Sequence, residues 1–313
     1  MNVPISLLLQ NLIGLFLLMA VGIAIVRFRI LPAGVIPMLS HLLMTVLGPA
    51  MVFHSLLRPF ESAFLHDSII ITVLGLGLYL GFTGLSLLAA HVLHISQNRR
   101  GTWAICTTFP NNGFMGFPVI QAVLGNDALA LASIMGISFT ILIYTMGVRV
   151  MLLDRSPGEG MPKISLIKLF VTPTNSATVL GLIFFLAQIP VPEVVALPIG
   201  HLADMATTMS MIIIGMKLSE TPGISALLNW EVLTGTLVKL LLIPGITYLL
   251  LSPLSLPNPL MLPMVLITMA MPSASCVVAV AGEYGVNADL AAEINFLSGT
   301  LCIVTVPLVA LLL

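Results

Sequence analysis

The sequence predicts an all-α membrane protein. Of its 313 residues, 58% are hydrophobic and only 7% are charged, whereas soluble domains carry about 25% charged residues. The apolar residues form blocks long enough for an α-helix to cross a bilayer, which takes roughly 20 residues. Lipid offers the backbone no hydrogen-bond partners, so these blocks must be helices, and they lack the apolar–polar alternation of barrel strands. The chain is therefore expected to cross the membrane several times, in contact with lipid.

Ten apolar blocks are expected to span the membrane. Their approximate ranges are 4–26, 36–57, 68–91, 101–124, 128–150, 165–188, 196–217, 230–251, 260–282 and 289–312. The longest connection, 151–164, contains Ser156-Pro157-Gly158, which is typical of an exposed loop. Residues 4–26 have no preceding Lys or Arg and no clear cleavage site, so we interpret them as a permanent span rather than a signal peptide.

The distribution of Lys and Arg predicts the orientation. Connections after odd-numbered spans, with their flanks, hold nine of the 11 basic residues, including Lys163, Lys168 and Lys217. Connections after even-numbered spans hold only Arg58, and Lys239 lies within a span. Basic connections stay in the cytoplasm, so both termini are expected outside. The net charge of −1 provides no basic surface for nucleic acid.

The central connection separates two halves with matching elements. Pro110 and Pro272 lie in the fourth span of their half, 162 residues apart. Each is followed by a similar turn, Gly125-Asn126-Asp127-Ala128 in one half and Gly285-Val286-Asn287-Ala288 in the other. Five spans per half is an odd number, so the halves insert with opposite orientations, as in many secondary transporters. The expected units are, in order, 1–150, the connection 151–164, and 165–313.

The fourth and ninth spans cannot remain straight helices. Residues 107–118 contain two prolines, two asparagines and two glycines, and residues 270–276 contain Pro272 with two serines. Proline removes a backbone donor and clashes with the preceding turn, and glycine tolerates unusual dihedral angles. The freed polar groups must face protein or water, because lipid cannot satisfy them.

Two such breaks predict an anion site. The half-helices that follow the breaks would start in the protein interior, where their N-termini attract anions through partial positive charge and free N–H groups. Two N-termini that meet near the midplane can bind a carboxylate without a dedicated Arg. A pair of ordinary proline kinks is the alternative interpretation. The candidate binding residues are Pro110, Asn111, Asn112, Gly113, Pro272, Ser273 and Ser275.

One motif resembles a known family. Residues 111–118, Asn-Asn-Gly-Phe-Met-Gly-Phe-Pro, are similar to the N-x-G-F-x-G-x-P signature of the auxin efflux carrier family, which includes bacterial malate or malonate permease-like proteins and the plant PIN carriers. Softer similarities cover the second half, at residues 175–181, 214–218, Lys239 with Pro244, and 298–300 with Pro307. The resemblance therefore extends over nearly the whole chain.

The resemblance implies a ten-helix inverted repeat in which helices 4 and 9 cross at Pro110 and Pro272. Helices 1, 2, 6 and 7 would form a scaffold, often dimeric, and helices 3–5 and 8–10 a moving transport unit. Asn111 and Asn112 would contact the substrate. The chain lacks the long cytosolic loop of the plant carriers, which fits a bacterial inner-membrane protein and argues against auxin as the natural substrate. Malate, malonate and an auxin-like acid all stay open.

Ionisable residues within the spans are further candidates, because they are costly in a membrane. Lys239, in span eight, can neutralise a substrate anion or extend to an interface. Asp204, in span seven, and Glu293, in span ten, are candidate carriers of a coupling ion. His54, in span two, can titrate near neutral pH, although a lone histidine more often only packs. No metal or cofactor is expected, and coupling to H⁺, to Na⁺ or to neither stays open.

Alternating-access transport of a small organic anion is the leading functional hypothesis. A channel would be expected to have a repeated filter or a ring of like charges, and the sequence has neither. An intramembrane enzyme would need paired acids or a nucleophile with a base, and no such local spacing is present. The sequence therefore favours a carrier over a channel, and a channel over an enzyme.

Overall fold

The structure is a computed structural model that describes residues 5–155, 172–219 and 229–312. Within these ranges the regular structure is helical apart from one isolated β-bridge, so the expected all-helical fold is confirmed. Seven of the described helices are long and apolar enough to cross a membrane, and Pro173–Ala187 and Met261–Ala270 are shorter apolar helices. Lys163, Lys168 and residues 156–164 of the central connection lie outside the described residues.

The described part of the chain contains fourteen α-helices. In chain order they are α1 (Ile5–Arg27), α2 (Ile36–Leu42), α3 (Gly48–Leu56), α4 (Ser62–Val92), α5 (Arg100–Thr108), α6 (Phe117–Leu142), α7 (Val148–Met151), α8 (Pro173–Ala187), α9 (Glu193–Ser219), α10 (Trp230–Leu237), α11 (Ile243–Leu251), α12 (Met261–Ala270), α13 (Ser275–Glu283) and α14 (Ala288–Ala310). Single π-helical turns join α2 to α3, α6 to α7 and α10 to α11, and another, Asn112–Gly116, leads directly into α6. These joined pairs therefore run as continuous helices.

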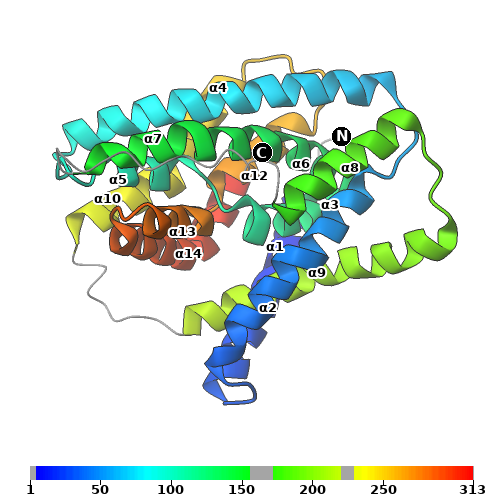
Figure 1. Ribbon diagram of the computed structural model, residues 1–313, viewed down its shortest axis with the longest axis horizontal. Helices are drawn as coiled ribbons and strands as arrows, with labels where there is room; N and C mark the ends of the chain where they lie inside the picture. The colour runs from blue at the N-terminus through cyan, green and yellow to red at the C-terminus, as the bar shows by residue number, and fades with distance from the viewer. Residues whose placement is uncertain (1–4, 156–171, 220–228, 313) are drawn as a thin grey trace.

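The helices form two packing groups, which can be followed in Figure 1. In one group, α1 packs along α9, and α3 packs against both α8 and α9. In the other group, α4 packs against α5 and α6, α12 packs against α6 and α11, and α14 packs against α10 and α13. Helix α6 contacts α1, α3, α8 and α9, so it is the main connection between the groups.

Two glycines make the turns that the matching motifs predicted. Gly125 has φ 83° and ψ −176°, which divides α6 at the expected boundary between the fourth and fifth apolar blocks. Gly285, between α13 and α14, has φ 65°. Positive φ angles are costly for residues with a Cβ atom, so glycine is the natural residue at both turns.

In each half, an acidic residue near the start of the third span bonds to a residue of the other half, in the connection between its third and fourth spans. Asn258 donates its side-chain N–H to Asp67 at 2.7 Å, and the Ser96 backbone N–H donates to Glu231 at 2.9 Å. Arg99 adds an ion pair to Glu231 at 2.7 Å. The two acids are 164 residues apart and their partners Ser96 and Asn258 are 162 apart, close to the spacing of the two prolines.

A distant carboxylate holds the first turn of α5. Asp154 accepts hydrogen bonds from the backbone N–H groups of Gly101 and Thr102, both at 2.7 Å, and from the Asn287 side chain at 3.1 Å. Helix N-termini leave such N–H groups without intrahelical partners. Asp154 therefore fixes the start of the helix that leads to the first break.

Replacing Asp154 with alanine is expected to lower the free energy of unfolding by about 1–2 kcal/mol, the usual effect of losing an N-terminal cap. Thermal unfolding of the purified protein in detergent would measure it. Asp289→Ala is the control, since Asp289 is an exposed acid in the first turn of α14. Equal effects in the two variants would contradict the capping role of Asp154.

Candidate functional site

The two expected breaks exist, and they meet. Helix α5 ends at Thr108 and the chain becomes helical again at Asn112, while α12 ends at Ala270 and α13 begins at Ser275. Between them, residues 109–111 and 272–274 pair as a short antiparallel bridge. The Asn111 N–H donates to the Pro272 carbonyl at 2.8 Å, and the Ala274 N–H donates to the Phe109 carbonyl at 2.9 Å. We call these two segments the crossover.

The crossover satisfies the backbone groups that its prolines release. Neither Pro110 nor Pro272 has an N–H group, and a buried carbonyl without a partner is costly. The bridge supplies two hydrogen bonds, and α14 supplies two more. The Ser298 hydroxyl accepts from the Ser273 N–H at 3.0 Å, and the Asn295 side chain donates to the Ser273 carbonyl. Each break therefore depends on the other half of the chain.

An aromatic cluster supports the first break. The ring of Tyr79 stacks on Phe109 with centroids 5.2 Å apart, and Phe139 meets both rings edge-on at 5.8 and 5.3 Å. Such pairs add about 0.5–1.5 kcal/mol beyond the burial of their area. The Tyr79 hydroxyl also accepts a hydrogen bond from the Asn112 side chain at 3.3 Å. The cluster therefore fixes the orientation of Asn112.

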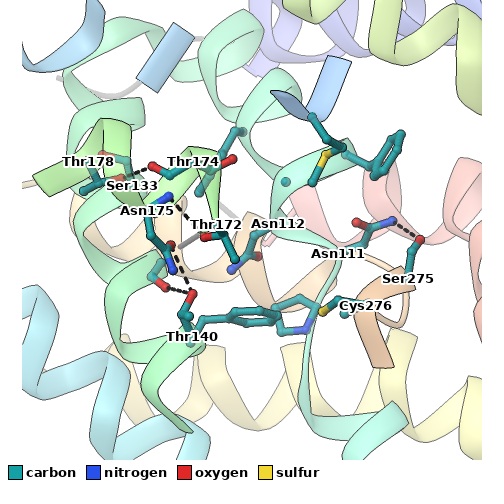
Figure 2. Close-up of a pocket in the computed structure, with 18 of the residues that line it drawn as sticks. Asn111, Asn112, Ser133, Thr140, Thr172, Thr174, Asn175, Thr178, Ser275 and Cys276 are labelled. Atoms are coloured by element: carbon teal, nitrogen blue, oxygen red, sulfur yellow. Dashed lines mark hydrogen bonds between the residues drawn. The ribbon is translucent and has the colours of Figure 1, made fainter. Parts of the chain in front are cut away.

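A cavity of about 330 Å³ lies against the crossover (Figure 2). Its wall combines aromatic and other apolar side chains with uncharged polar groups. The residues that line it are Met44, Pro110, Asn111, Asn112, Gly113, Phe114, Phe117, Ser133, Gly136, Phe139, Thr140, Tyr144, Thr172, Thr174, Asn175, Thr178, Ala274, Ser275 and Cys276. Not one of these described residues is Asp, Glu, Lys, Arg or His. We call it the crossover cavity.

Two helix N-termini supply N–H groups to this wall. Gly113 and Phe114 lie in the first turn of the helix that follows the first break, and Ser275 and Cys276 begin α13. The first N–H groups of a helix have no intrahelical acceptor, and they carry partial positive charge. These N–H groups can therefore bind an anionic or polar ligand. The Asn112 side-chain oxygen is buried with no hydrogen-bond partner among the described residues, and as an acceptor it can bind only a donor group of a ligand.

The opposite wall of the crossover cavity contains polar residues that the sequence reasoning missed. The Thr140 hydroxyl donates to the Asn175 side chain at 3.1 Å, and the Asn175 N–H donates to the Thr172 hydroxyl at 3.3 Å (Figure 2). Asn175 lies in the segment that resembles the sixth helix of the family, so that similarity was the available signal. Thr140 is a single hydroxyl in an apolar block, and nothing in the sequence distinguishes it.

A second, smaller cavity of about 110 Å³ lies on the other side of the crossover. It shares Asn111 and Ser275 with the first, and their side chains are joined by a 3.3 Å hydrogen bond (Figure 2). Its wall also includes Asn295 and Lys217, neither of which was predicted as a site residue. The Lys217 ammonium lies 4.1 Å from the centroid of the Phe114 ring, so a cation is close to both cavities.

Comparison with known proteins identifies the family. The model of the family described as membrane transport protein matches residues 7–160 and again residues 159–310. The chain belongs to this family. The resemblance to the auxin efflux carriers is thereby confirmed, and transport across a membrane is the function that the family supports. A similar protein, 28% identical over 284 residues that cover 86% of each chain, is an uncharacterized transporter of Methanothermobacter thermautotrophicus.

The structure brings most of the predicted binding residues of this family member together. Pro110, Asn111, Asn112, Gly113 and Ser275 line the crossover cavity, as Figure 2 shows for the labelled asparagines and Ser275. Pro272 lines the second cavity. Ser273 is fully buried in the bridge, so its backbone rather than its side chain shapes the site.

The predicted charged candidates lie elsewhere. Lys239 is fully buried, and its ammonium donates to the Thr108 carbonyl at 3.4 Å, behind the crossover. Glu293 accepts from the Asn229 side chain at 3.4 Å. Asp204 is exposed on α9, and His54 is half-buried in α3. The structure does not bring these four residues to the crossover cavity, and their coupling roles stay predictions.

Proposed function

We propose that the chain is a secondary transporter that carries a small organic monocarboxylate with an apolar body across the inner membrane. One observation carries this proposal: the crossover cavity combines two helix N-termini with aromatic walls and an uncharged polar lining. The N-termini and the amides of Asn111 and Asn112 would hold the carboxylate. Phe114, Phe117 and Phe139 would enclose the apolar body of the substrate.

The charge of the lining favours one negative charge on the substrate over two. Burying an ionised group is costly unless it is paired or hydrogen-bonded. The helix N-termini supply partial positive charge for one carboxylate. A second carboxylate would lie among aromatic rings and neutral hydroxyls, because the described lining contains no Lys, Arg or His, and Lys217, whose ammonium lies against the Phe114 ring, is outside that lining. Of the substrate classes that the resemblance left open, an auxin-like acid therefore fits this cavity better than malate or malonate.

The reciprocal contacts support an inverted repeat of ten spans. The paired acids, the turn glycines and the bridged prolines all recur at intervals of 160–164 residues. The two family matches meet near residue 160, within the predicted central connection. In this proposal, the group built on α1, α3, α8 and α9 is the scaffold. A dimer of the protein would form through contacts between the scaffolds of its two subunits. The group built on α4–α6 and α10–α14 is the transport unit.

Alternating access is supported by the difference between the two sides of the crossover. On one side, an open hollow contains His41 and Lys217, and it shares Met44 and Phe114 with the crossover cavity. The distribution of basic residues places this side in the cytoplasm. The structure would therefore represent an inward-open state.

The opposite side, which would face outward, has a hollow lined by Gln121 and Thr207 that shares no residue with the crossover cavity, and polar contacts join the helices there. Asn11 donates to the Ala122 carbonyl at 2.9 Å, and Thr207 donates to the Gln121 side chain at 2.6 Å. Arg58, the one basic residue in the connections expected outside, forms an ion pair with Asp127 at 3.1 Å. A cavity that shares its lining with the hollow on one side, and not with the hollow on the other, supports a carrier rather than a channel.

A series of three ligands with one common body tests the proposed substrate class. Phenylacetate, phenylacetamide and phenylmalonate carry formal charges of about −1, 0 and −2 at neutral pH. Phenylacetate is expected to show counterflow into proteoliposomes. The other two should compete with it at least about tenfold more weakly, because phenylacetamide lacks the negative charge and phenylmalonate has a second carboxylate without a partner. Stronger competition by phenylmalonate would contradict a monoanion site. No saturable uptake of any carboxylate would contradict the proposed function.

A further inference from the structure

Lys239 lies at the carboxyl end of a broken helix. It belongs to the π-helical turn between α10 and α11, its side chain is 0% exposed, and its ammonium donates to the carbonyl of Thr108, the last residue of α5. In an unbroken helix the Asn112 N–H would donate to that carbonyl. Here the Asn112 N–H donates instead to the Pro110 carbonyl at 2.9 Å. The break therefore frees the acceptor that Lys239 contacts.

The groups around the Lys239 ammonium carry the partial negative charge that a bound cation needs. A helix C-terminus carries partial negative charge, and the carboxyl ends of broken helices coordinate coupling cations in many transporters. The Thr108 hydroxyl bonds to the Ser86 hydroxyl at 3.2 Å, so further oxygen atoms are close to this helix end. Neither of the ion pairs found among the described residues includes Lys239. The ammonium thus contacts a helix-end carbonyl, and neither of these ion pairs gives it a carboxylate.

The second break differs in this respect. There, neutral side chains of α14 hold the bridge residue Ser273, since Ser298 accepts from the Ser273 N–H and Asn295 donates to the Ser273 carbonyl. The position 162 residues before Lys239 is Gly77, which cannot supply a charge. A fixed cation is therefore built into one half of the repeat and not into the other.

We propose that the Lys239 ammonium occupies the cation position at the carboxyl end of α5, so that the anion is bound and carried without sodium. Its positive charge would offset that of the anion at the N-termini beyond the break, and the low dielectric of the protein interior strengthens this attraction. Lys239 does not line the crossover cavity, so it is a positioning residue rather than a binding residue. The transport part of this inference rests on the proposed function, whereas the cation position can be tested without any substrate.

The first test is thermal unfolding of the purified full-length protein in sodium, lithium or choline chloride at equal ionic strength. The wild type is expected to unfold at the same temperature in all three salts. Lys239→Ser, which leaves space and an added hydroxyl, is expected to be less stable in choline and to be stabilised saturably by sodium or lithium. Lys239→Met keeps the length of the side chain without a ligand oxygen, and it should gain nothing from either ion.

The wild-type measurement decides the outcome even if a variant does not fold. Saturable stabilisation of the wild type by sodium, or a sodium requirement for its ligand binding, would overturn the proposal. Equal responses of folded Lys239→Ser and Lys239→Met to sodium and lithium would overturn it as well. In proteoliposomes, phenylacetate uptake by Lys239→Ser should fall at least about tenfold in choline and recover in sodium. If the wild type carries no monocarboxylate, the proposed function fails, while the unfolding data still decide the role of Lys239.

Discussion

Asn112→Ala should abolish uptake of a monocarboxylate or reduce it at least about tenfold, while expression and unfolding temperature stay near those of the wild type. The Asn112 side-chain NH2 group donates one N–H to the Tyr79 hydroxyl at 3.3 Å, and its second N–H would donate to the substrate carboxylate. A hydrogen bond to a charged group contributes about 1.5–3 kcal/mol, which corresponds to roughly 10- to 100-fold in affinity. Loss of this amide would also free Tyr79, so the orientation of the site would be lost together with a direct contact.

Asn111→Ala should have a similar but smaller effect, because the Asn111 side chain is half-buried and already bonded to Ser275. Asn98→Ala is the matched control: Asn98 is exposed in the connection between α4 and α5, and the variant should transport normally. Uptake kinetics in proteoliposomes at equal protein content would separate the three variants. Normal transport by both Asn111→Ala and Asn112→Ala would show that the crossover cavity is not the substrate site.

The sequence was sufficient to locate the breaks because their chemistry is local. Pro110 and Pro272 lack the donor that a continuous helix needs, and that deficiency is visible without any partner. The same holds for Gly125 and Gly285, whose turns need positive φ angles. Asn111 was recognisable because it begins a dense cluster of helix-breaking residues within an apolar block.

The remaining site residues depend on contacts between distant segments. Thr140 and Asn175 are 35 residues apart and become one wall only because α6 packs against α8. Asp154 caps α5 from 53 residues away, and Asn295 reaches the crossover from α14. A single polar residue in an apolar helix has no periodic pattern that names its partner. For that reason the sequence made Lys239 a candidate functional residue, but did not show which helix end it contacts.

Gly215→Ala is expected to lower the free energy of unfolding by about 3 kcal/mol or more, at the upper limit of the usual cost of overpacking a core. A Cβ atom at Gly215 would lie 1.9 Å from the Met19 carbonyl oxygen, and one at Gly22 would lie 2.1 Å from the Ile212 carbonyl oxygen. Both obstacles are backbone atoms, so no side chain can move aside. Small residues permit such close approach between membrane helices, where packing replaces the hydrophobic effect as the main attraction.

Thermal unfolding in detergent would measure this effect, with Gly14→Ala in the partner helix α1 as a control. No atom lies within 4 Å of a Cβ atom at Gly14, so alanine there should be neutral or stabilising by about 0.5–1 kcal/mol. A stability of Gly215→Ala equal to that of the wild type would show that α1 and α9 are not in this close contact.

The double variant Gly22→Ala/Gly215→Ala gives a further test of the same contact. Real Cβ atoms essentially never come closer than 3.0 Å to a neighbouring heavy atom, whereas either new Cβ atom would lie 1.9 or 2.1 Å from a carbonyl oxygen. Either alanine alone must therefore push α1 and α9 apart. Once the helices have separated, the second methyl group meets less obstruction. The double variant should therefore lose less stability than the sum of the losses in the two single variants. Full additivity would mean that each glycine is tight for a separate, local reason. Sub-additive loss would show that the α1–α9 distance is one property of the helix pair.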